Sequence, residues 1–302
     1  MDLSEGKEEG GGRKGAPLLY PADWLIAVYL LFVTVVIVVR GGIEGHDGWL
    51  MAAHGLFGVL LVLLTRLSLA DRFGQFLRDL YPLLLLLGFY AEIGVLSEAF
   101  GRDAIFAHDV VVQGWEAAIF GGQPSYDWIR RSPSLFWSGL LHLAYSFYYI
   151  IVFLGPLLLW LRGRHAAARQ VVFATMVAFV VCYVVFILYP VAGPNYMFEH
   201  PTGPVREVWS ARLVYRVLEG GSSVGAAFPS SHVAATVAAT VALWHQWRAL
   251  SVAFVIPAIL LVVGTVYCQM HYGVDAGSGL LVGVVAGWFG GRGEGSPKGL
   301  SI

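Results

Sequence analysis

Long runs of apolar residues constrain this chain more than any other feature of its sequence. The runs are 16 to 27 residues long, and charged or glycine-rich loops separate them. A helix needs about 20 apolar residues to cross the hydrocarbon core of a bilayer, and it satisfies its own backbone hydrogen bonds while doing so. The pattern therefore predicts an all-α fold, a polytopic membrane helix bundle.

The composition agrees with a membrane protein and excludes several other classes. Hydrophobic residues make up 57% of the chain, charged residues only 13%, and the mean hydropathy is +0.69. A soluble domain carries about 25% charged residues, so a soluble nucleic-acid binder is excluded. The net charge of −1 gives no general attraction to an anionic partner. Cys182 and Cys268 both lie in apolar runs, so they indicate neither a disulfide framework nor a cysteine-based metal site.

We predict about eight transmembrane segments, arranged as two N-terminal helices followed by a six-helix core. Residues 1–22 and 292–302 are polar and glycine-rich, so both are expected to be cytoplasmic tails, the first of them disordered. Residues 23–78 contain the two N-terminal transmembrane helices, and residues 79–291 contain the core. The eight predicted segments are 24–40, 49–65, 79–97, 135–161, 171–190, 231–247, 250–268 and 275–290.

The basic residues predict how the bundle is oriented. Twelve of the 19 Lys and Arg residues fall on one side, in the tails and in short loops. Positive residues gather in cytoplasmic loops, so both termini are predicted inside and the long loops 98–134 and 191–230 outside. Within these loops, 103–120 and 205–219 have the spacing of amphipathic surface helices that cap the bundle. The twelve are Lys7, Arg13, Lys14, Arg66, Arg72, Arg78, Arg162, Arg164, Arg169, Arg248, Arg292 and Lys298.

The stretch GGSSVGAAFPSSHVAATVAATVALWH, which begins at Gly220, carries the clearest chemical signal. Its glycines and serines lead into Pro229, Ser230 and Ser231, which are typical of a helix start and place His232 in the first turn. The free N–H groups and positive dipole end of a helix N-terminus favour a bound anion such as phosphate. A lone histidine here is equally well explained as a hydrogen-bonded interfacial residue.

A second histidine follows 39 residues later, in TVYCQMHYGVDAGSGLLVG. That separation lets one helix cross and the next return at about 1.5 Å per residue, so His271 and Asp275 are expected on the same side as His232. A carboxylate that accepts a proton from one imidazole nitrogen fixes the tautomer and leaves the other nitrogen free to attack. The second histidine is then available as acid or base.

FPSSH followed by HYGVD resembles the second and third signature motifs of the type 2 phosphatidic-acid phosphatase superfamily. The resemblance is closest to its inositol-phosphorylceramide synthase and sphingomyelin synthase branch, to which LLHLAYSFYY, YPVAGPNY and FGGQPS are also similar. It implies that 79–291 is a catalytic membrane domain. It also implies that His271 takes the phosphoryl group as phosphohistidine, that Asp275 orients it, and that His232 protonates the leaving oxygen and later deprotonates the acceptor.

The chain differs from the hydrolytic members of that superfamily in its basic residues. It lacks their Lys-to-Arg-Pro motif, and Gly264 and Thr265 stand where they have Ser-Arg. The phosphate clamp is therefore unidentified, which favours the synthase-like branch. Arg206 and Arg212 are also explained as headgroup contacts of an interfacial helix. His142 and Tyr149 are also explained as packing on a helix face, and Asn195 as a turn residue. The candidate substrate- and phosphate-binding residues are Ser230, Ser231, His142, Tyr149, Asn195, Arg206 and Arg212.

The expected function is that of an integral membrane lipid phosphotransferase, an inositolphosphotransferase-like enzyme, with its site on the outer (periplasmic, extracellular or luminal) side. Its partners would be a phospholipid or lipid phosphate and a lipid alcohol acceptor, and the chemistry requires no cofactor. The alternative is a lipid-phosphate or polyprenyl-diphosphate phosphatase with water as acceptor. A proton-coupled transporter also stays open, because ionisable residues inside membranes mark proton paths. His232, His271 and Asp275 have the ligand types of a metal site, but the helix start suits an oxyanion better, so no metal is expected.

Overall fold

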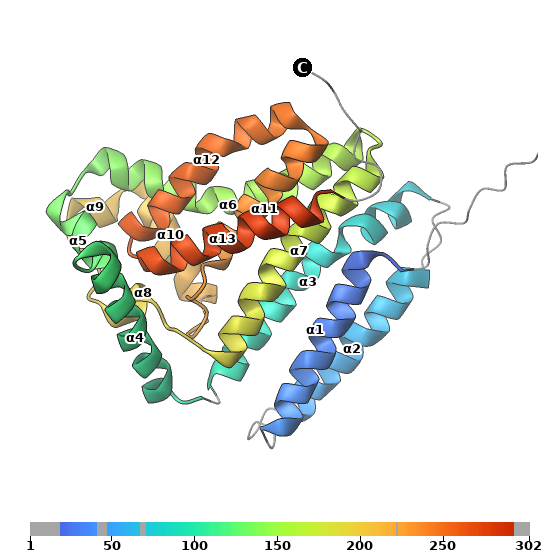
Figure 1. Ribbon diagram of the computed structural model, residues 1–302, viewed down its shortest axis with the longest axis horizontal. Helices are drawn as coiled ribbons and strands as arrows, with labels where there is room; N and C mark the ends of the chain where they lie inside the picture. Colours follow the sequence, from blue (N-terminus) through green and yellow to red (C-terminus); the bar gives the residue numbers. More distant parts are fainter. Residues whose placement is uncertain (1–18, 41–46, 67–70, 99, 222, 293–302) are drawn as a thin grey trace, which may run out of the picture.

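The computed structural model describes residues 19–40, 47–66, 71–98, 100–221 and 223–292, and within these ranges the chain is almost entirely helical. Figure 1 shows most of the long helices running alongside one another, with α4, α5, α8, α9 and α10 gathered at one end. This architecture confirms the predicted all-α bundle. The helices are α1 (Pro21–Val39), α2 (Asp47–Arg66), α3 (Arg72–Glu98), α4 (Arg102–Phe120), α5 (Pro124–Arg131), α6 (Leu135–Leu161), α7 (His165–Leu188), α8 (Pro194–Met197), α9 (Pro204–Glu207), α10 (Trp209–Gly221), α11 (Ser231–Gln246), α12 (Arg248–Tyr267) and α13 (Gly273–Gly290).

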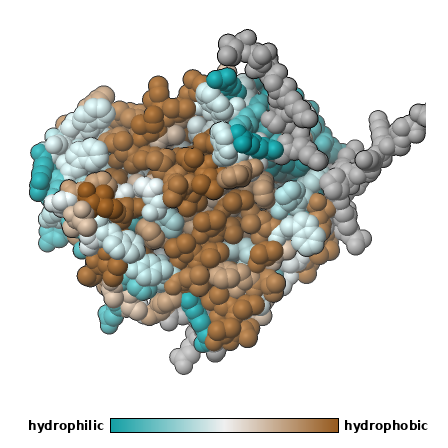
Figure 2. All heavy atoms as spheres, viewed as in Figure 1, coloured by the Kyte–Doolittle hydropathy of each residue, from teal (hydrophilic) through white to brown (hydrophobic). Residues whose placement is uncertain are grey.

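Six of these helices, α1, α3, α6, α7, α12 and α13, are long and apolar enough to cross a bilayer. In α2 the apolar stretch is shorter, Leu50–Leu64, and α11 has 16 residues. All eight predicted segments thus lie in helices, while the count of about eight crossings stays a prediction. Figure 2 shows apolar side chains spread over the middle of one face, with more hydrophilic residues towards its edges, as expected of a surface that faces lipid.

Helix α11 lies at the centre of the core, where α6, α7, α12 and α13 surround it. Its closest neighbour is α13, which turns Gly279, Gly283 and Gly287 towards it. A Cβ added at Gly283 would lie 2.6 Å from the carbonyl oxygen of Ala234, and one at Gly287 would lie 2.7 Å from that of Ala238. Small residues at every fourth position let two membrane helices touch through their backbones. The two helices that begin at the candidate site are therefore held at a fixed separation.

Buried polar pairs, one of them a salt bridge, attach the two N-terminal helices to α3. Arg78 Nη1 donates to Asp23 Oδ1 of α1 at 2.9 Å, and His54 of α2 pairs with Glu92. Glu92 thereby links two helices. The first pair also explains why α3 begins at Arg72, seven residues before the predicted start of that segment. Because Asp23 neutralises Arg78, the polar first turns of α3 can continue the helix into the core.

Other helix boundaries also differ from the predicted ones. Helix α1 begins at Pro21, inside the stretch predicted as a tail, because proline fits the first turn of a helix. Helix α7 begins at His165 rather than 171, where Arg169 Nη1 donates to Asp79 Oδ1 at 2.9 Å. The loops predicted at 98–134 and 191–230 contain α4, α5 and α8 to α10. Residues 1–18 and 293–302 of the predicted tails lie outside the described residues.

Replacing Gly283 by valine should force α11 and α13 apart. The added side chain would overlap the backbone of Ala234, and overpacking of this kind costs about 1–3 kcal/mol. The midpoint of thermal denaturation in detergent is expected to fall by at least about 3 °C. Gly277→Val is the matched control, because nothing lies within 4 Å of a Cβ at Gly277. Equal midpoints for the two variants would contradict the close packing.

Candidate active site

A short turn between α12 and α13 carries His271. The N–H groups of Met270 and His271 both donate to the carbonyl oxygen of Thr265 at 2.9 Å, which closes the end of α12. Gln269, in the same turn, has a φ of +60°, in the left-handed region where residues other than glycine are uncommon. The turn ends where α13 begins, so Asp275 lies in the first turn of that helix.

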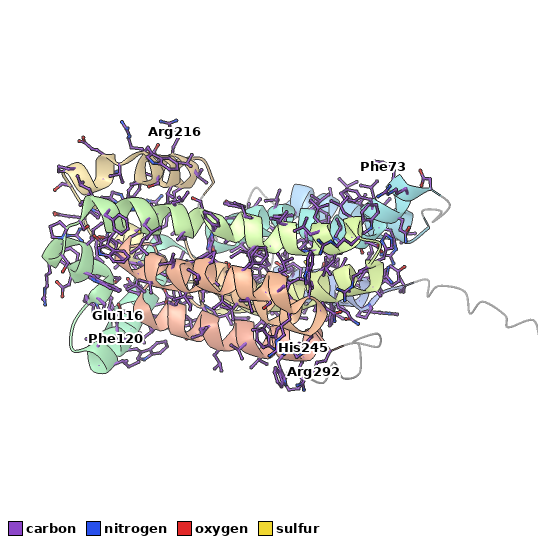
Figure 3. All side chains as sticks on the ribbon, turned by 90° about the horizontal axis from the view of Figure 1, so that it is seen from above. Phe73, Glu116, Phe120, Arg216, His245 and Arg292 are labelled. Carbon is purple, nitrogen blue, oxygen red and sulfur yellow. The ribbon has the colours of Figure 1, made fainter. Side chains whose placement is uncertain are left out.

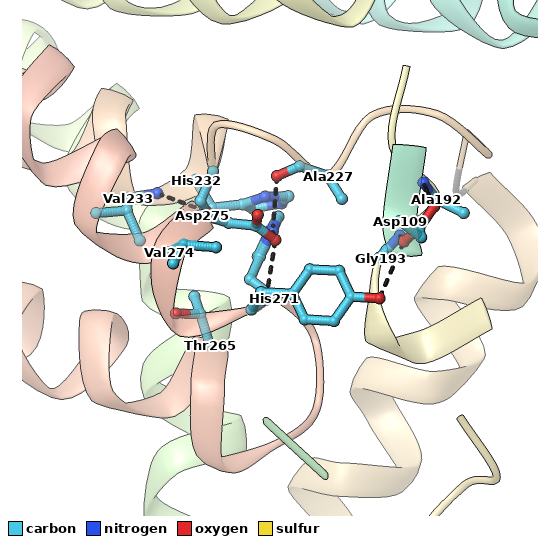
Figure 4. Close-up of polar contacts among 12 residues, drawn as sticks. Asp109, Ala192, Gly193, Ala227, His232, Val233, Thr265, His271, Val274 and Asp275 are labelled. Atoms are coloured by element: carbon cyan, nitrogen blue, oxygen red, sulfur yellow. Dashed lines mark hydrogen bonds and ion pairs between the residues drawn. The ribbon is translucent and has the colours of Figure 1, made fainter. Parts of the chain in front are cut away.

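The imidazole of His271 is held by two acceptors (Figure 4). Its Nδ1 lies 3.1 Å from the carbonyl oxygen of Ala227 and 3.5 Å from Asp275 Oδ2. A carbonyl oxygen can only accept, so Nδ1 carries the proton and Nε2 keeps its lone pair in the neutral ring. Asp275 Oδ2 also accepts the N–H of Tyr272 at 2.8 Å. The carboxylate predicted to orient His271 therefore shares that proton with a closer backbone carbonyl.

His232 lies beside His271, in the first turn of α11, as the spacing of the two motifs predicts. The centroids of the two rings are 5.8 Å apart. Ser230 caps α11, since its hydroxyl accepts the N–H of Val233 at 3.4 Å, and its own N–H donates to the carbonyl oxygen of Asp275 at 3.0 Å. The starts of α11 and α13 are thus bonded directly to each other, which brings the two histidines and the carboxylate together.

Two tyrosines of α6 pack against the His232 ring. The hydroxyl of Tyr145 lies 3.3 Å from His232 Nε2, and the Tyr148 ring meets the imidazole edge-on at a centroid distance of 4.5 Å. The other nitrogen, Nδ1, is buried and has no hydrogen-bond partner among the described residues. His232 is half-buried, whereas His271 is 4% exposed. Of the two rings, His232 is therefore the one with an open side.

That open side faces a cavity of about 280 Å³ between α3, α6, α7 and α10. Ser231 and His232 form part of its wall, and none of the described residues that line it is Asp, Glu, Lys or Arg. The remaining wall is largely apolar, so the cavity suits an uncharged ligand with a hydroxyl group. Its tyrosines are Tyr90, Tyr145, Tyr148, Tyr149 and Tyr183.

Burial keeps the His271 ring neutral. It lowers the pKa of His271 to about 4, and the hydrogen bond to the Ala227 carbonyl opposes part of that shift. The ring is consequently unprotonated at neutral pH, with the Nε2 lone pair available. A neutral imidazole beside a carboxylate and a second histidine can act as a nucleophile towards an electrophilic phosphorus or carbon atom.

The predicted binding residues on α6 lie on different sides of that helix. His142 is fully buried and its Nδ1 donates to the carbonyl oxygen of Ser138 at 2.8 Å, while its ring packs against Tyr215 of α10 at 5.8 Å. Its Nε2 has no hydrogen-bond partner among the described residues. Tyr149 is 43% exposed and lines the cavity. Only Tyr149 of these two therefore shares a cavity with His232.

The predicted residues in the second outer loop are more dispersed. Arg206 of α9 stacks over the Tyr215 ring at 4.6 Å, on the ring that also contacts His142. Arg212 is exposed on α10, and Asn195 lies in α8. No described contact joins any of the three to the two histidines. Their predicted role in substrate binding stays a prediction.

Several residues around the site are not among those predicted from the sequence. Arg130 of α5 donates to Gln269 Oε1 at 2.7 Å, two residues before His271, whereas the arginines singled out were Arg206 and Arg212. Asp109 and Glu116 are fully buried on α4. Acidic residues on the apolar face of an amphipathic helix could have revealed these two, but the Ala227 carbonyl leaves no sequence signal because every residue has one.

No group of three or more His, Cys, Asp or Glu side chains within the described ranges has an arrangement that could hold a metal ion. His232, His271 and Asp275 are therefore not arranged as metal ligands in this geometry. The ring of His271 instead directs its Nδ1 proton at oxygen acceptors.

The buried His271 should make stability depend on pH. The folded-state pKa of His271 is about 4, below its ordinary value of 6.5. Between pH 4 and pH 6.5 the imidazole is therefore protonated in the unfolded chain and unprotonated in the folded protein. The stabilisation is present above pH 6.5 and is lost as the pH falls towards 4, by about 2 kcal/mol at pH 5. His271→Gln should therefore lose less thermal stability than the wild type between pH 7 and pH 5. The same pH dependence in both proteins would contradict this assignment.

Comparison with known proteins now identifies the family. The sequence model of the PAP2 superfamily matches residues 115–289, which run from α4 to α13 and include both histidine motifs. No curated protein and no solved structure gives a significant match to the chain. Because the matched region covers more than half of the chain and contains the whole histidine–carboxylate arrangement, the chain belongs to the PAP2 superfamily.

Proposed function

We propose that this protein is a lipid phosphotransferase that moves a phosphoryl or phospho-head group between lipid alcohols through a phosphohistidine at His271. A helical membrane protein of the PAP2 superfamily fits a lipid phosphatase or phosphotransferase acting on lipid phosphates in the bilayer. The observation that carries the finer proposal is the arrangement of the two rings. His271 has its Nδ1 proton engaged, and His232 lies 5.8 Å away between it and an uncharged cavity.

In the first step, His271 Nε2 attacks phosphorus, the N–P bond forms and the P–O bond to the departing alcohol breaks. His232, protonated, donates its proton to the departing oxygen. In the second step, His232 takes the proton of the acceptor hydroxyl, whose oxygen attacks phosphorus as the N–P bond breaks. Asp275 and the Ala227 carbonyl, at 3.5 and 3.1 Å from Nδ1, stabilise the positive charge on the ring of the intermediate.

The start of α11 supports an oxyanion next to these rings. Ser230 caps and Ser231 begins a 16-residue helix whose first N–H groups and dipole favour negative charge. We assign the phosphoryl oxygens to this helix start, with Tyr149 lining the lipid side. His142, Asn195, Arg206 and Arg212 stay as proposed contacts of the headgroup.

Two features favour transfer in the manner of the inositol-phosphorylceramide and sphingomyelin synthase branch. The chain lacks the Lys-to-Arg-Pro phosphate motif of the hydrolytic members, and a phosphodiester carries less charge than a terminal phosphate. The cavity beside His232 is uncharged and largely apolar, as a lipid alcohol requires. Hydrolysis is the second candidate, because the half-buried His232 is also within reach of water.

The proposal places the site on the outer side of the membrane. Glu116 and Arg216 lie at one end of the bundle and His245 and Arg292 at the other, and the basic short loops belong to the second end (Figure 3). The native cysteines, Cys182 and Cys268, are buried, so they provide a silent background for thiol labelling.

A cysteine introduced at exposed Thr202, between α8 and α9, should react with a membrane-impermeant maleimide in intact cells. Arg162→Cys, at the opposite end between α6 and α7, should react only after the membrane is permeabilised. Labelling is measured by gel shift. Labelling of Arg162→Cys but not of Thr202→Cys in intact cells would contradict the proposed orientation and place the site on the cytoplasmic side.

Replacing His271 by asparagine should abolish group transfer, because the attacking nitrogen is lost. Purified protein in detergent receives phosphatidylinositol labelled with ³²P and ceramide as acceptor, and the labelled lipid product is separated and counted. Loss of a covalent nucleophile lowers turnover by on the order of 10³-fold or more. His245→Asn, a histidine at the opposite end, is the matched control and should keep wild-type turnover.

Base-quenched wild-type protein should also carry label on His271 during turnover. Residual transfer within tenfold of the wild type in His271→Asn would overturn the phosphohistidine. If labelled water-soluble phosphate esters or free phosphate form and ceramide never competes, the phosphatase replaces the transferase.

A further inference from the structure

Helix α4 buries two carboxylates on the face that it turns towards the site. Asp109 and Glu116 are both 0% exposed, and they share this face with Ile105 and Val112. The four residues follow the spacing i, i+4, i+7 and i+11, which is one side of an α-helix. The proposed reaction assigns neither carboxylate a role.

Asp109 accepts two backbone N–H groups of the second outer loop. Its Oδ2 binds the N–H of Ala192 at 2.7 Å and its Oδ1 that of Gly193 at 2.8 Å. The preceding residue, Val191, pairs with the segment that leads to α11, since its carbonyl oxygen accepts the N–H of Ala227 at 2.9 Å. Asp109 thus fixes the segment 191–193 that pairs with Ala227, whose own carbonyl oxygen accepts from His271.

Asp109 is also bonded to the residue next to His271. The hydroxyl of Tyr272 donates to Asp109 Oδ1 at 3.0 Å and accepts from Gln113 Nε2 at 3.0 Å. One carboxylate therefore joins the two segments whose relative position decides where His271 Nε2 points. These are the segment 191–193, which pairs with Ala227, and the turn before α13.

Glu116 holds the start of α13 from the same helix face. Its Oε2 accepts the N–H of Val274 at 3.2 Å, and its Oε1 lies 3.5 Å from the N–H of Ser125 of α5. Asp275 is the next residue after Val274. The two carboxylates of α4 thus contact both flanks of the His271–Asp275 pair.

Burial of these carboxylates carries a cost that packing alone does not require. Loss of solvent raises the pKa of both Asp109 and Glu116, and the hydrogen bonds that they accept offset only part of the shift. Apolar residues of similar volume usually pack such a face at equal or lower free energy. What a carboxylate supplies and an apolar side chain does not is a fixed acceptor geometry for several N–H and O–H donors.

We propose that Asp109 is a positioning residue for the nucleophile: through Ala192, Gly193 and Tyr272 it holds the Ala227 carbonyl and the His271 turn in register. The expected change in kcat rests on the proposed function. The expected change in the position of the His271 ring rests on the geometry alone. Glu116 supports the same turn at the start of α13.

The test compares Asp109→Asn with Asp103→Asn, an exposed aspartate in the first turn of the same helix. Asparagine keeps one acceptor and turns an N–H₂ group towards a backbone N–H, so segment 191–193 and the His271 turn should lose their register. The kcat for transfer is expected to fall at least tenfold in Asp109→Asn, with KM within threefold of the wild type. Asp103→Asn should match the wild type in both constants, and Asp109→Glu, which keeps the carboxylate, should regain part of kcat.

Tyr272→Phe supplies a milder variant that leaves both backbone hydrogen bonds of Asp109 in place. It should lower kcat by less than Asp109→Asn does. The kcat of the double variant Asp109→Asn/Tyr272→Phe should be no lower than that of Asp109→Asn alone, because both changes affect the same hydrogen bond between Tyr272 and Asp109. Fully additive losses, or an unchanged kcat in a folded Asp109→Asn protein, would overturn the positioning role.

A measurement without turnover separates this inference from the proposed reaction. The rate at which diethyl pyrocarbonate modifies His271, followed by mass spectrometry of the peptide, reports the accessibility of its free nitrogen. Asp109→Asn should change that rate at least threefold, whereas Asp103→Asn should not. If the rate changes but the wild-type protein transfers no phosphoryl group, the proposed function fails and the positioning role stands. If transfer occurs but the rate and kcat do not respond to Asp109→Asn, the positioning role fails alone.

Discussion

The close approach of α11 and α13 is the constraint on which the candidate site depends. His232 lies on the first helix, Asp275 on the second, and His271 in the turn that leads into the second. Glycines of α13 lie against the carbonyl oxygens of α11, and the main chains are bonded directly where both helices start. The relative position of the two rings is consequently set by backbone contacts, which are less adaptable than contacts between long side chains.

Around this backbone frame the site is surrounded by acceptors. Asp275, Asp109 and Glu116 are all fully buried, and each accepts a hydrogen bond from at least one main-chain N–H group. The same design extends to the His271 ring, whose proton meets a main-chain carbonyl before it meets the carboxylate. Helices α4 and α5 thus contact the site through Asp109, Glu116 and Arg130, and the match to the PAP2 superfamily begins within α4, at residue 115.

The sequence predicts the membrane bundle and the central pair of motifs well, because apolar runs and the 39-residue spacing are properties of the chain itself. It fails where the deciding partner is distant. The predicted start of α3, residue 79, is seven residues too late, because the sequence does not show that Asp23, 55 residues earlier, neutralises Arg78. Arg130 was passed over because its bond to Gln269 spans 139 residues. The Ala227 carbonyl could not be predicted from any residue type.

The charge pairs of α3 have a consequence for how the chain is made. Arg78 and Glu92 both lie in that helix, and their partners Asp23 and His54 lie in the two helices that precede it. Synthesis from the N-terminus therefore makes Asp23 and His54 before Arg78 and Glu92. Without Asp23 and His54, a guanidinium and a carboxyl group would face hydrocarbon at considerable cost. The order of the elements along the chain thus matches an order in which Arg78 and Glu92 of α3 find their partners already made.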